Sequence, residues 1–232
     1  MIAWLGKRQR PVVDSGRQAG EEGDGRLHVV LAGDSIFDNA YYVPGGQPVI
    51  EQLKGSLSPG ARASLLAVDG AVTRDVAEQL ALLPPGASHR LISVGGNDAL
   101  GFADCLDIQV ETVGQALSEL AEIRREFAES YRAMLAAATA TGLELAVCSI
   151  YDKVPDLDPG AHTALALFNE VIMREAFSAG IPLIDLRLVC SEESDYSVVS
   201  PIEPSEQGGQ KLVRAVLDFC EPEIEWACRV YK

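Results

Sequence analysis

The sequence has little of what a disulfide-bonded or zinc-binding protein requires. Its five cysteines are Cys105, Cys148, Cys190, Cys220 and Cys228. Their number is odd, their spacing is irregular and no Cys-x-x-Cys pair occurs, so neither a disulfide framework nor a zinc site is indicated. We therefore expect reduced thiols and a cytoplasmic location.

Long apolar runs and an excess of basic residues are also absent. Residues 1–6 are too short for the apolar core of a signal peptide, and the basic residues follow them instead of preceding them. No stretch reaches the roughly twenty apolar residues of a membrane span. With 19 basic and 34 acidic side chains, the formal charge is −15, which opposes contact with nucleic acid or an anionic lipid surface. We expect a small-molecule partner, no nucleic acid and no membrane.

What the sequence does contain is enough apolar residues, 47% of 232, for one packed α/β domain. Residues 1–26 are polar, rich in glycine and charged in both signs, which predicts a flexible leader. The domain is expected over residues 27–220. Residues 221–232 form a tail with only a weak helical pattern.

Strand-like and helix-like apolar patterns alternate along the predicted domain. The expected strands are 27–32, 63–68, 91–94, 143–150 and 181–186, and helical spacing follows each of them. The longest helical pattern, at 112–140, carries a stripe that we expect to be core: Val113, Leu117, Leu120, Ile123, Phe127, Tyr131 and Met134. This alternation predicts a parallel sheet covered by helices on both faces.

Gly33-Asp34-Ser35 follows the first expected strand, and the functional interpretation of the chain begins with these residues. Gly33 permits a tight turn that a side chain would obstruct. If a helix begins directly after it, the backbone amides near Ser35 favour developing negative charge on its hydroxyl. The same three residue types are also common in turns with no further role.

Two later strands end in a similar way. Gly70 follows the second strand, and Gly95-Gly96-Asn97-Asp98 follows the third. A turn-forming role explains each of them alone. Ligands of open parallel sheets, however, gather at the carboxyl ends of the strands, where the Gly70 amide and the Asn97 carboxamide would face the same crevice as Ser35.

Together these residues resemble the GDSL, or SGNH, hydrolase family. The blocks Gly33-Asp34-Ser35-Ile36, Gly70, Gly95-Gly96-Asn97-Asp98 and Pro204-Ser205 occur in the family's order, over about 27–219. The resemblance implies a flavodoxin-like three-layer α/β/α sandwich with a central parallel five-stranded sheet. It also implies hydrolysis of esters or thioesters, or acyl transfer, without a cofactor. Ser35 would be the nucleophile, and the oxyanion hole would consist of the Ser35 amide, the Gly70 amide and the Asn97 side chain.

The last block departs from the family, which has Asp-x-x-His before Pro-Ser. Here Glu203 stands in place of the histidine and Ser200 in place of the aspartate. A pocket that raises the pKa of Glu203 would let its carboxylate act as the general base. The alternative is an acidic residue placed before a helix N-terminus.

The sequence contains other titratable residues that are expected near the crevice. His28 and His89 are expected at strand beginnings, at the far edge from Ser35, and only His162 is expected on the proper edge. Asp34, Asp38 and Asp98 have turn capping as their ordinary role.

We therefore predict a serine hydrolase of the SGNH type that acts on small esters or acyl groups through an acyl-Ser35 intermediate, with Glu203 as base. The alternatives are a binding protein on the same scaffold that is impaired in catalysis, and an acyltransferase.

Overall fold

The apolar segments form a five-stranded parallel sheet in the computed structural model, which describes residues 26–221. The strands are β1 (His28–Gly33), β2 (Arg62–Leu65), β3 (His89–Ser93), β4 (Glu144–Cys148) and β5 (Leu183–Ile184). Their order in the sheet is β2-β1-β3-β4-β5. Leu31 is paired with Leu65 on one side and with Leu91 on the other. This order is that of flavodoxin-like sheets, in which ligands bind at the switch point between β1 and β3.

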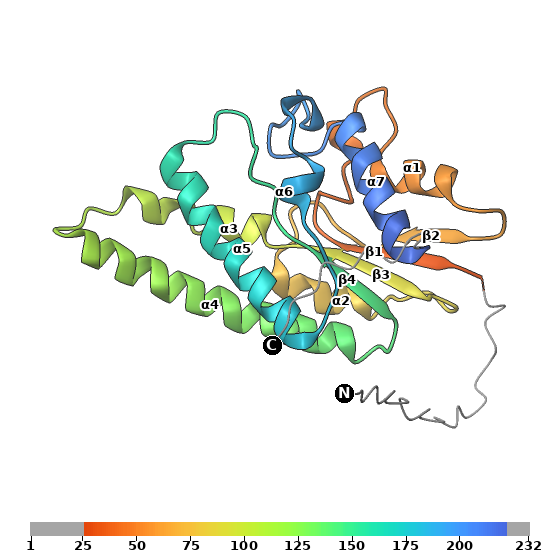
Figure 1. Ribbon diagram of the computed structural model, residues 1–232, viewed down its shortest axis with the longest axis horizontal. Coiled ribbons are helices and arrows are strands. Elements are labelled where there is room, and N and C mark those ends of the chain that lie inside the picture. Colours follow the sequence, from red (N-terminus) through yellow and green to blue (C-terminus); the bar gives the residue numbers. More distant parts are fainter. Residues whose placement is uncertain (1–25, 222–232) are drawn as a thin grey trace, which may run out of the picture.

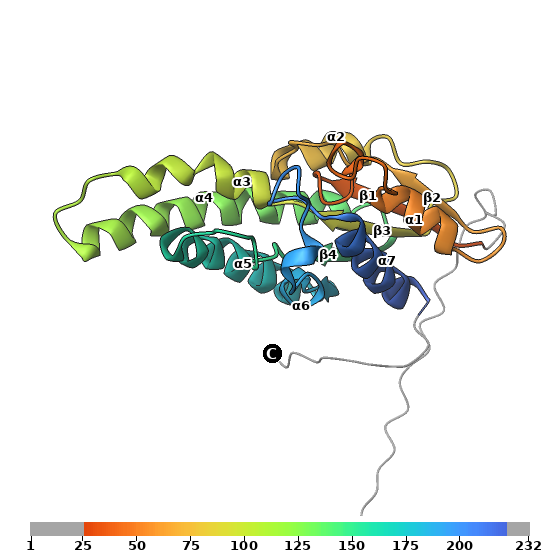
Figure 2. The same ribbon diagram turned by 90° about the horizontal axis from the view of Figure 1, so that it is seen from above.

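Helices cover both faces of the sheet, and the predicted three-layer α/β/α sandwich is confirmed. The α-helices are α1 (Val49–Ser56), α2 (Val76–Leu80), α3 (Gly96–Gly101), α4 (Val113–Thr139), α5 (Pro159–Ala179), α6 (Leu186–Val189) and α7 (Glu206–Cys220). Short 3₁₀ helices are η1 (Ala40–Tyr42), η2 (Thr73–Asp75), η3 (Ala103–Asp107) and η4 (Glu193–Asp195). Figure 2 shows α2 and α4 on one side of the sheet and α6 and α7 on the other.

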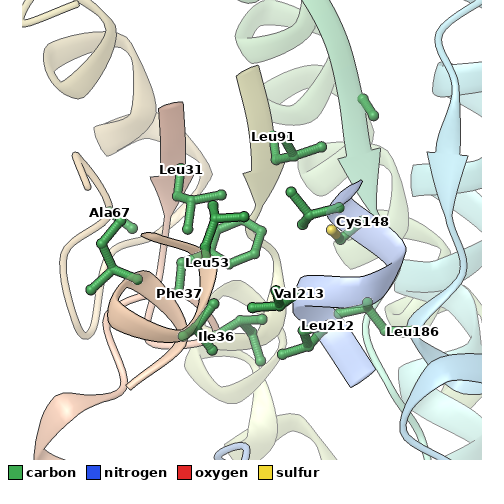
Figure 3. Packing of buried hydrophobic residues seen from close by; sticks show 14 of the residues in the cluster. Leu31, Ile36, Phe37, Leu53, Ala67, Leu91, Cys148, Leu186, Leu212 and Val213 are labelled. Carbon is green, nitrogen blue, oxygen red and sulfur yellow. The ribbon is translucent and has the colours of Figure 1, made fainter. Parts of the chain in front are cut away.

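The side chains of the buried strands form two separate cores, one on each face of the sheet. Side chains such as Leu31 and Leu91 pack with α1, α6 and α7, as Figure 3 shows for the cluster that contains Leu53 and Leu212. Side chains that point to the other face of the sheet, such as Ile92, pack with α2, α4 and α5. Successive side chains of a strand point to opposite faces, so strands that are apolar at nearly every position suit a sheet covered on both sides.

The prediction that the whole stripe on α4 is core was wrong for the first half of the helix. Phe127 and Tyr131 are buried, but Val113 is 76% and Leu117 is 60% exposed. A helix of 27 residues is about 40 Å long, whereas the strands, which have two to six residues, span at most about 20 Å. The first half of α4 therefore extends beyond the carboxyl edge of the sheet, together with α3 and the start of α5 (Figure 1).

Several predictions fall partly outside the described residues. These are the leader over residues 1–26, the tail over residues 221–232, and Cys228. The four cysteines in the described part are free thiols. None of the helices described is long and apolar enough to cross a membrane.

Candidate active site

Ser35 lies in the turn that ends β1, and Gly33 is the reason that this turn can form. Gly33 has a φ of +117°, and a Cβ at this position would lie 1.8 Å from the carbonyl oxygen of Ser93. The ends of β1 and β3 therefore approach so closely that only glycine fits. The Asp34 amide donates to the same Ser93 oxygen at 2.9 Å. This contact fixes Ser35, which is buried, at the carboxyl edge of the sheet.

A helix does not begin directly after Ser35. Residues 35–37 form a turn, η1 follows at Ala40, and the first α-helix begins only at Val49. The Ile36 amide donates to the Asp34 carboxylate at 3.2 Å, and the Phe37 and Asp38 amides donate to the Asp34 carbonyl oxygen at 3.1 and 3.2 Å. Asp34 therefore organises this turn with both its side chain and its backbone. Among the described residues, no acceptor contacts the Ser35 amide, which therefore remains available to a ligand.

Glu203 is the residue that contacts the Ser35 hydroxyl. The Ser35 Oγ donates to the Glu203 Oε1 at 3.0 Å, although the two residues are 168 positions apart. Both side chains are buried, with 6% and 4% of their surface exposed. The other carboxylate oxygen of Glu203, Oε2, is buried and has no hydrogen-bond partner in the described part of the chain.

Hydrogen bonds to its carbonyl oxygens hold the segment that carries Glu203. The Ser197 amide donates to the Glu203 carbonyl oxygen at 2.8 Å. The Tyr151 hydroxyl donates to the Ile202 carbonyl oxygen at 2.5 Å, and the Asn39 side chain donates to the Pro204 carbonyl oxygen at 3.3 Å. These bonds fix the backbone on both sides of Glu203 and so fix the direction of its side chain.

The electrostatics of the site favour protonated carboxyl groups. Burial raises the pKa of Glu203 from 4.5 to about 7; the hydrogen bond from Ser35 opposes this shift, and the charge of Asp69 adds to it. Burial also raises the pKa of Asp34 well above its ordinary value, and the nearby Glu203 raises it further. Glu203 consequently changes its charge near neutral pH, where an ordinary glutamate is fully ionised.

Asn97 lies in the first turn of α3 and lines the same cavity as Ser35 and Glu203. Its Nδ2 donates to the Ala71 carbonyl oxygen at 3.0 Å. A carboxamide nitrogen carries two hydrogens, so one of them is left for a ligand. The bond also ties α3 to the loop after β2.

Gly70 lies in that loop, beside Ala71 and beside Asp69, whose charge acts on Glu203. Its φ is +80°, and no acceptor in the described part of the chain contacts its amide. Gly70 is not among the residues that line the cavity. The structure thus gathers Ser35, Asn97 and Glu203 around one cavity and places Gly70 in the adjoining loop.

None of the three histidines contacts Ser35. His162 lies in the first turn of α5 and faces Asp152, with 3.6 Å between its Nε2 and the Oδ2. His28 and His89 lie at the beginnings of β1 and β3, as predicted, at the opposite edge of the sheet.

The aspartates around the site have mainly structural partners. Asp38 accepts from the Asp69 amide at 3.0 Å. Asp98 accepts from the amide and the hydroxyl of Thr73 at 2.9 and 3.0 Å. Across the described residues, no group of three or more histidine, cysteine, aspartate or glutamate side chains could hold a metal ion.

The cavity at Ser35 has a volume of about 160 Å³ and two chemically different ends. Polar side chains, among them Ser35, Asn97 and Glu203, lie at the sheet edge. Alkyl and aromatic side chains line the rest. Most of them come from α3, η3, α4 and α5, and others, such as Ile36, Tyr151 and Ile202, come from loops outside these helices. A largely apolar cavity with a few convergent polar groups is typical of a small-molecule site.

Two positioning residues were missed by the sequence analysis. Asn39 is fully buried; its Oδ1 accepts from the Val49 amide at 2.9 Å while its Nδ2 reaches Pro204. Tyr151 supports Ile202 in the same way. No local motif identifies either of them, because their partners lie far away in the sequence.

Comparisons with known proteins identify the family of the chain. The sequence profile of the GDSL-like lipase/acylhydrolase family matches residues 31–211. No curated protein sequence is significantly similar to this chain.

Similar solved structures share the fold at low sequence identity. An extracellular lipase from Streptomyces rimosus is 20% identical with a TM-score of 0.58, over 82% of this chain and 98% of that one. Phospholipase A1 from Streptomyces albidoflavus is 18% identical with a TM-score of 0.60, also over 82% and 98%. An acetyl xylan esterase from Geobacillus stearothermophilus is 16% identical with a TM-score of 0.60, over 88% and 99%.

Proposed function

Since this chain belongs to the GDSL-like lipase/acylhydrolase family, we propose that it hydrolyses carboxylic esters through an acyl intermediate on Ser35, with Glu203 as the general base. The observation that carries the proposal is the buried hydrogen bond of 3.0 Å from the Ser35 Oγ to the Glu203 Oε1. The similar structures are a lipase, a phospholipase A1 and an acetyl xylan esterase, which supports an ester as the substrate.

In the first step, the Ser35 oxygen attacks the ester carbonyl carbon while its proton moves to Glu203. A serine hydroxyl is a weak nucleophile until a neighbouring base accepts this proton. A base works best when its pKa lies near the operating pH, and the pKa of Glu203 is raised to about 7. The raised pKa therefore compensates in part for the absence of histidine at this position.

The tetrahedral intermediate carries a negative oxygen that needs hydrogen-bond donors. We assign this role to the Ser35 amide and the free Nδ2 hydrogen of Asn97, which line the cavity, and to the Gly70 amide from the adjoining loop. The two amides have no acceptor among the described residues, so binding the oxyanion breaks no bond that holds the fold. Each such donor is worth roughly 3 kcal/mol of transition-state stabilisation.

Collapse of this intermediate breaks the bond to the alcohol, which takes the proton back from Glu203. Water then attacks the acyl-Ser35 ester and gives its proton to Glu203, and breakage of the ester bond returns that proton to the Ser35 oxygen and releases the acid. One carboxyl group thus serves as acceptor and donor in turn.

The experiment that tests the proposal measures hydrolysis of 4-nitrophenyl acetate by the wild type and by Ser35→Ala, with Ser58→Ala as the control. Ser58 is an exposed serine outside the cavity. We expect Ser35→Ala to lose at least 10³-fold in kcat and Ser58→Ala to match the wild type. Asn97→Ala should lose about 10²-fold, the effect of one oxyanion donor. Equal rates for the wild type and Ser35→Ala contradict the mechanism.

A second candidate function is a binding protein that keeps the cavity without turnover. It is favoured by one observation, the absence of a histidine contact at Ser35 in the described part of the chain. A fluorophosphonate probe separates the two candidates, since only an activated serine is labelled rapidly. An acyltransferase on the same scaffold would instead form product only when an acceptor alcohol or thiol is supplied.

A further inference from the structure

The apolar part of the cavity runs outward from the sheet edge, between α3 with η3 on one side and α4 and α5 on the other. We call this part the channel. Its inner end lies at Phe168, whose ring packs on Phe127 with 4.8 Å between the centroids. The Phe127 ring in turn lies 3.2 Å from the position that a Cβ of Gly95 would take. Gly95 lies two residues after Ser93, the last residue of β3, so Phe168 lies near that edge of the sheet.

The outer end of the channel lies near the beginning of α5. Lining residues on this helix extend from Phe168 back to Ala161. Seven residues of α-helix correspond to about 10 Å. On α4 the lining residues Leu120 and Ile123 precede Phe127 in the same direction, which is the direction in which both helices extend beyond the sheet (Figure 1, Figure 2).

The lining of the channel suits an alkyl chain. The outer part is lined mainly by alkyl side chains such as Leu106, Leu120 and Leu165. Arg124 also lines the cavity, but its guanidinium is bound to the Glu170 carboxylate at 2.9 and 2.5 Å. Its charge is therefore already paired, and a polar or charged substituent gains little there compared with water.

We propose that the channel binds the acyl chain of the substrate and selects chains of about eight carbons. The proposal rests on the proposed function, because the carbonyl carbon of that chain must reach Ser35. An extended backbone spans about 3.5 Å per three bonds, so about 10 Å accommodates roughly nine bonds. Leu100 and Leu106 line the cavity and are 51% and 45% exposed, so the rest of a longer chain reaches solvent.

The role of Glu203 decides which half of the ester enters the channel. The base returns its proton to the leaving alcohol, so the alcohol lies on the Glu203 side of Ser35. The acyl chain then points away from Glu203. Asn97 and the rest of α3 border the cavity where the channel begins, and this side is left for the acyl chain.

The test uses 4-nitrophenyl esters with acyl chains of two to twelve carbons. For the wild type, kcat/KM should rise up to about fourfold per added methylene, the value of burying one such group, and level off near eight carbons. A flat profile, or a maximum at the acetyl ester, overturns the proposal. A series of acetate esters with increasing alcohol length is the complementary test, and a larger gain in that series overturns the assignment of the acyl half.

Ala164→Trp and Ala166→Trp make a matched pair of variants on α5. Ala164 lines the channel about 6 Å from Phe168, whereas Ala166 is exposed and does not line it. Ala164→Trp should lower kcat/KM for the octanoyl ester at least tenfold relative to the acetyl ester. The rise of kcat/KM with chain length should stop near five carbons. Ala161→Trp, at the outer end, should leave the rise of kcat/KM to stop near eight carbons, as in the wild type. Equal profiles for Ala164→Trp and Ala166→Trp contradict the channel.

A binding measurement separates this inference from the proposed function. Ser35→Ala protein is titrated with 1-butanol and 1-octanol by calorimetry, with and without Ala164→Trp. We expect at least tenfold tighter binding of 1-octanol, and loss of this preference with Ala164→Trp. If no ester is hydrolysed but this pattern holds, the proposed function is wrong and the channel stands. If esters are hydrolysed without any dependence on chain length, the channel is wrong and the function stands.

Discussion

The two ends of the cavity are built from opposite kinds of side chain. At the sheet edge, Ser35, Asp34 and Glu203 are buried polar groups, and one Glu203 oxygen has no hydrogen-bond partner among the described residues. At the outer end, Leu120 and Leu165 face a space bounded by other apolar side chains. A buried carboxylate without full hydrogen bonding opposes folding, and apolar side chains around an empty space lose packing contacts, so neither end of the cavity serves stability. The comparison indicates that the inner end is arranged for chemistry and the outer end for binding.

The largest expected effect is at the inner end, on the reaction rate. Glu203→Gln keeps the shape of the side chain and an acceptor for the Ser35 hydroxyl, but it cannot take up a proton. We expect kcat for a short-chain ester to fall by 10²- to 10⁴-fold, the usual contribution of a general base. For the wild type, the rate should fall about tenfold per pH unit below pH 7, since the pKa of Glu203 is raised to about 7.

The control for this variant is Glu193→Gln, an exposed glutamate outside the cavity. It should keep the wild-type rate and the wild-type pH profile. A Glu203→Gln variant that retains more than a tenth of the wild-type kcat would show that Glu203 is not the general base.

The second effect is on stability, and it follows from the same pKa. Because the pKa of folded Glu203 is about 7 and its ordinary value is 4.5, the folded state binds more protons than the unfolded state between these two pH values. The free energy of unfolding therefore falls as pH rises through this window. This loss amounts to roughly 3 kcal/mol and disappears in Glu203→Gln.

Urea denaturation at pH 4.5 and pH 8 measures this difference directly. The free energy of unfolding of Glu203→Gln minus that of the wild type should rise by about 3 kcal/mol between the two pH values. The contributions of the other titrating groups to the free energy of unfolding largely cancel in this subtraction. If the difference between the two free energies of unfolding does not change with pH, Glu203 is not desolvated, and the contrast between the two ends of the cavity is lost.

The smallest effect is expected at the outer end. Leu117 lies on the apolar stripe of α4 but is 60% exposed, so Leu117→Ala should change the free energy of unfolding by less than about 0.5 kcal/mol. Phe127 lies on the same stripe where α4 packs on the sheet, and Phe127→Ala should cost about 3–5 kcal/mol. Thermal or urea unfolding of the two variants measures both values. Similar costs would mean that the first half of α4 belongs to the folded core.

Much of the sheet could be predicted because its strands are short, apolar and bounded by turn residues. The predicted strands at 91–94 and 143–150 correspond closely to β3 and β4, and the helix at 112–140 corresponds to α4. The short helix α3 was not predicted, because it begins with Gly96 and Asn97, and both residue types are poor helix formers. Its first turn is stabilised by long-range contacts such as the bond from Asn97 to Ala71.

The sequence alone determined the family, the parallel order of strands and helices, and the candidates Ser35, Gly70, Asn97 and Glu203. These follow from local patterns, since glycine turns and apolar periods are fixed by neighbouring residues. The tertiary structure decided that Glu203 contacts Ser35 across 168 positions and that the stripe on α4 leaves the core halfway along the helix. Hydrogen bonding and burial depend on residues that are distant in the chain, and burial in turn sets the pKa that makes Glu203 a candidate base.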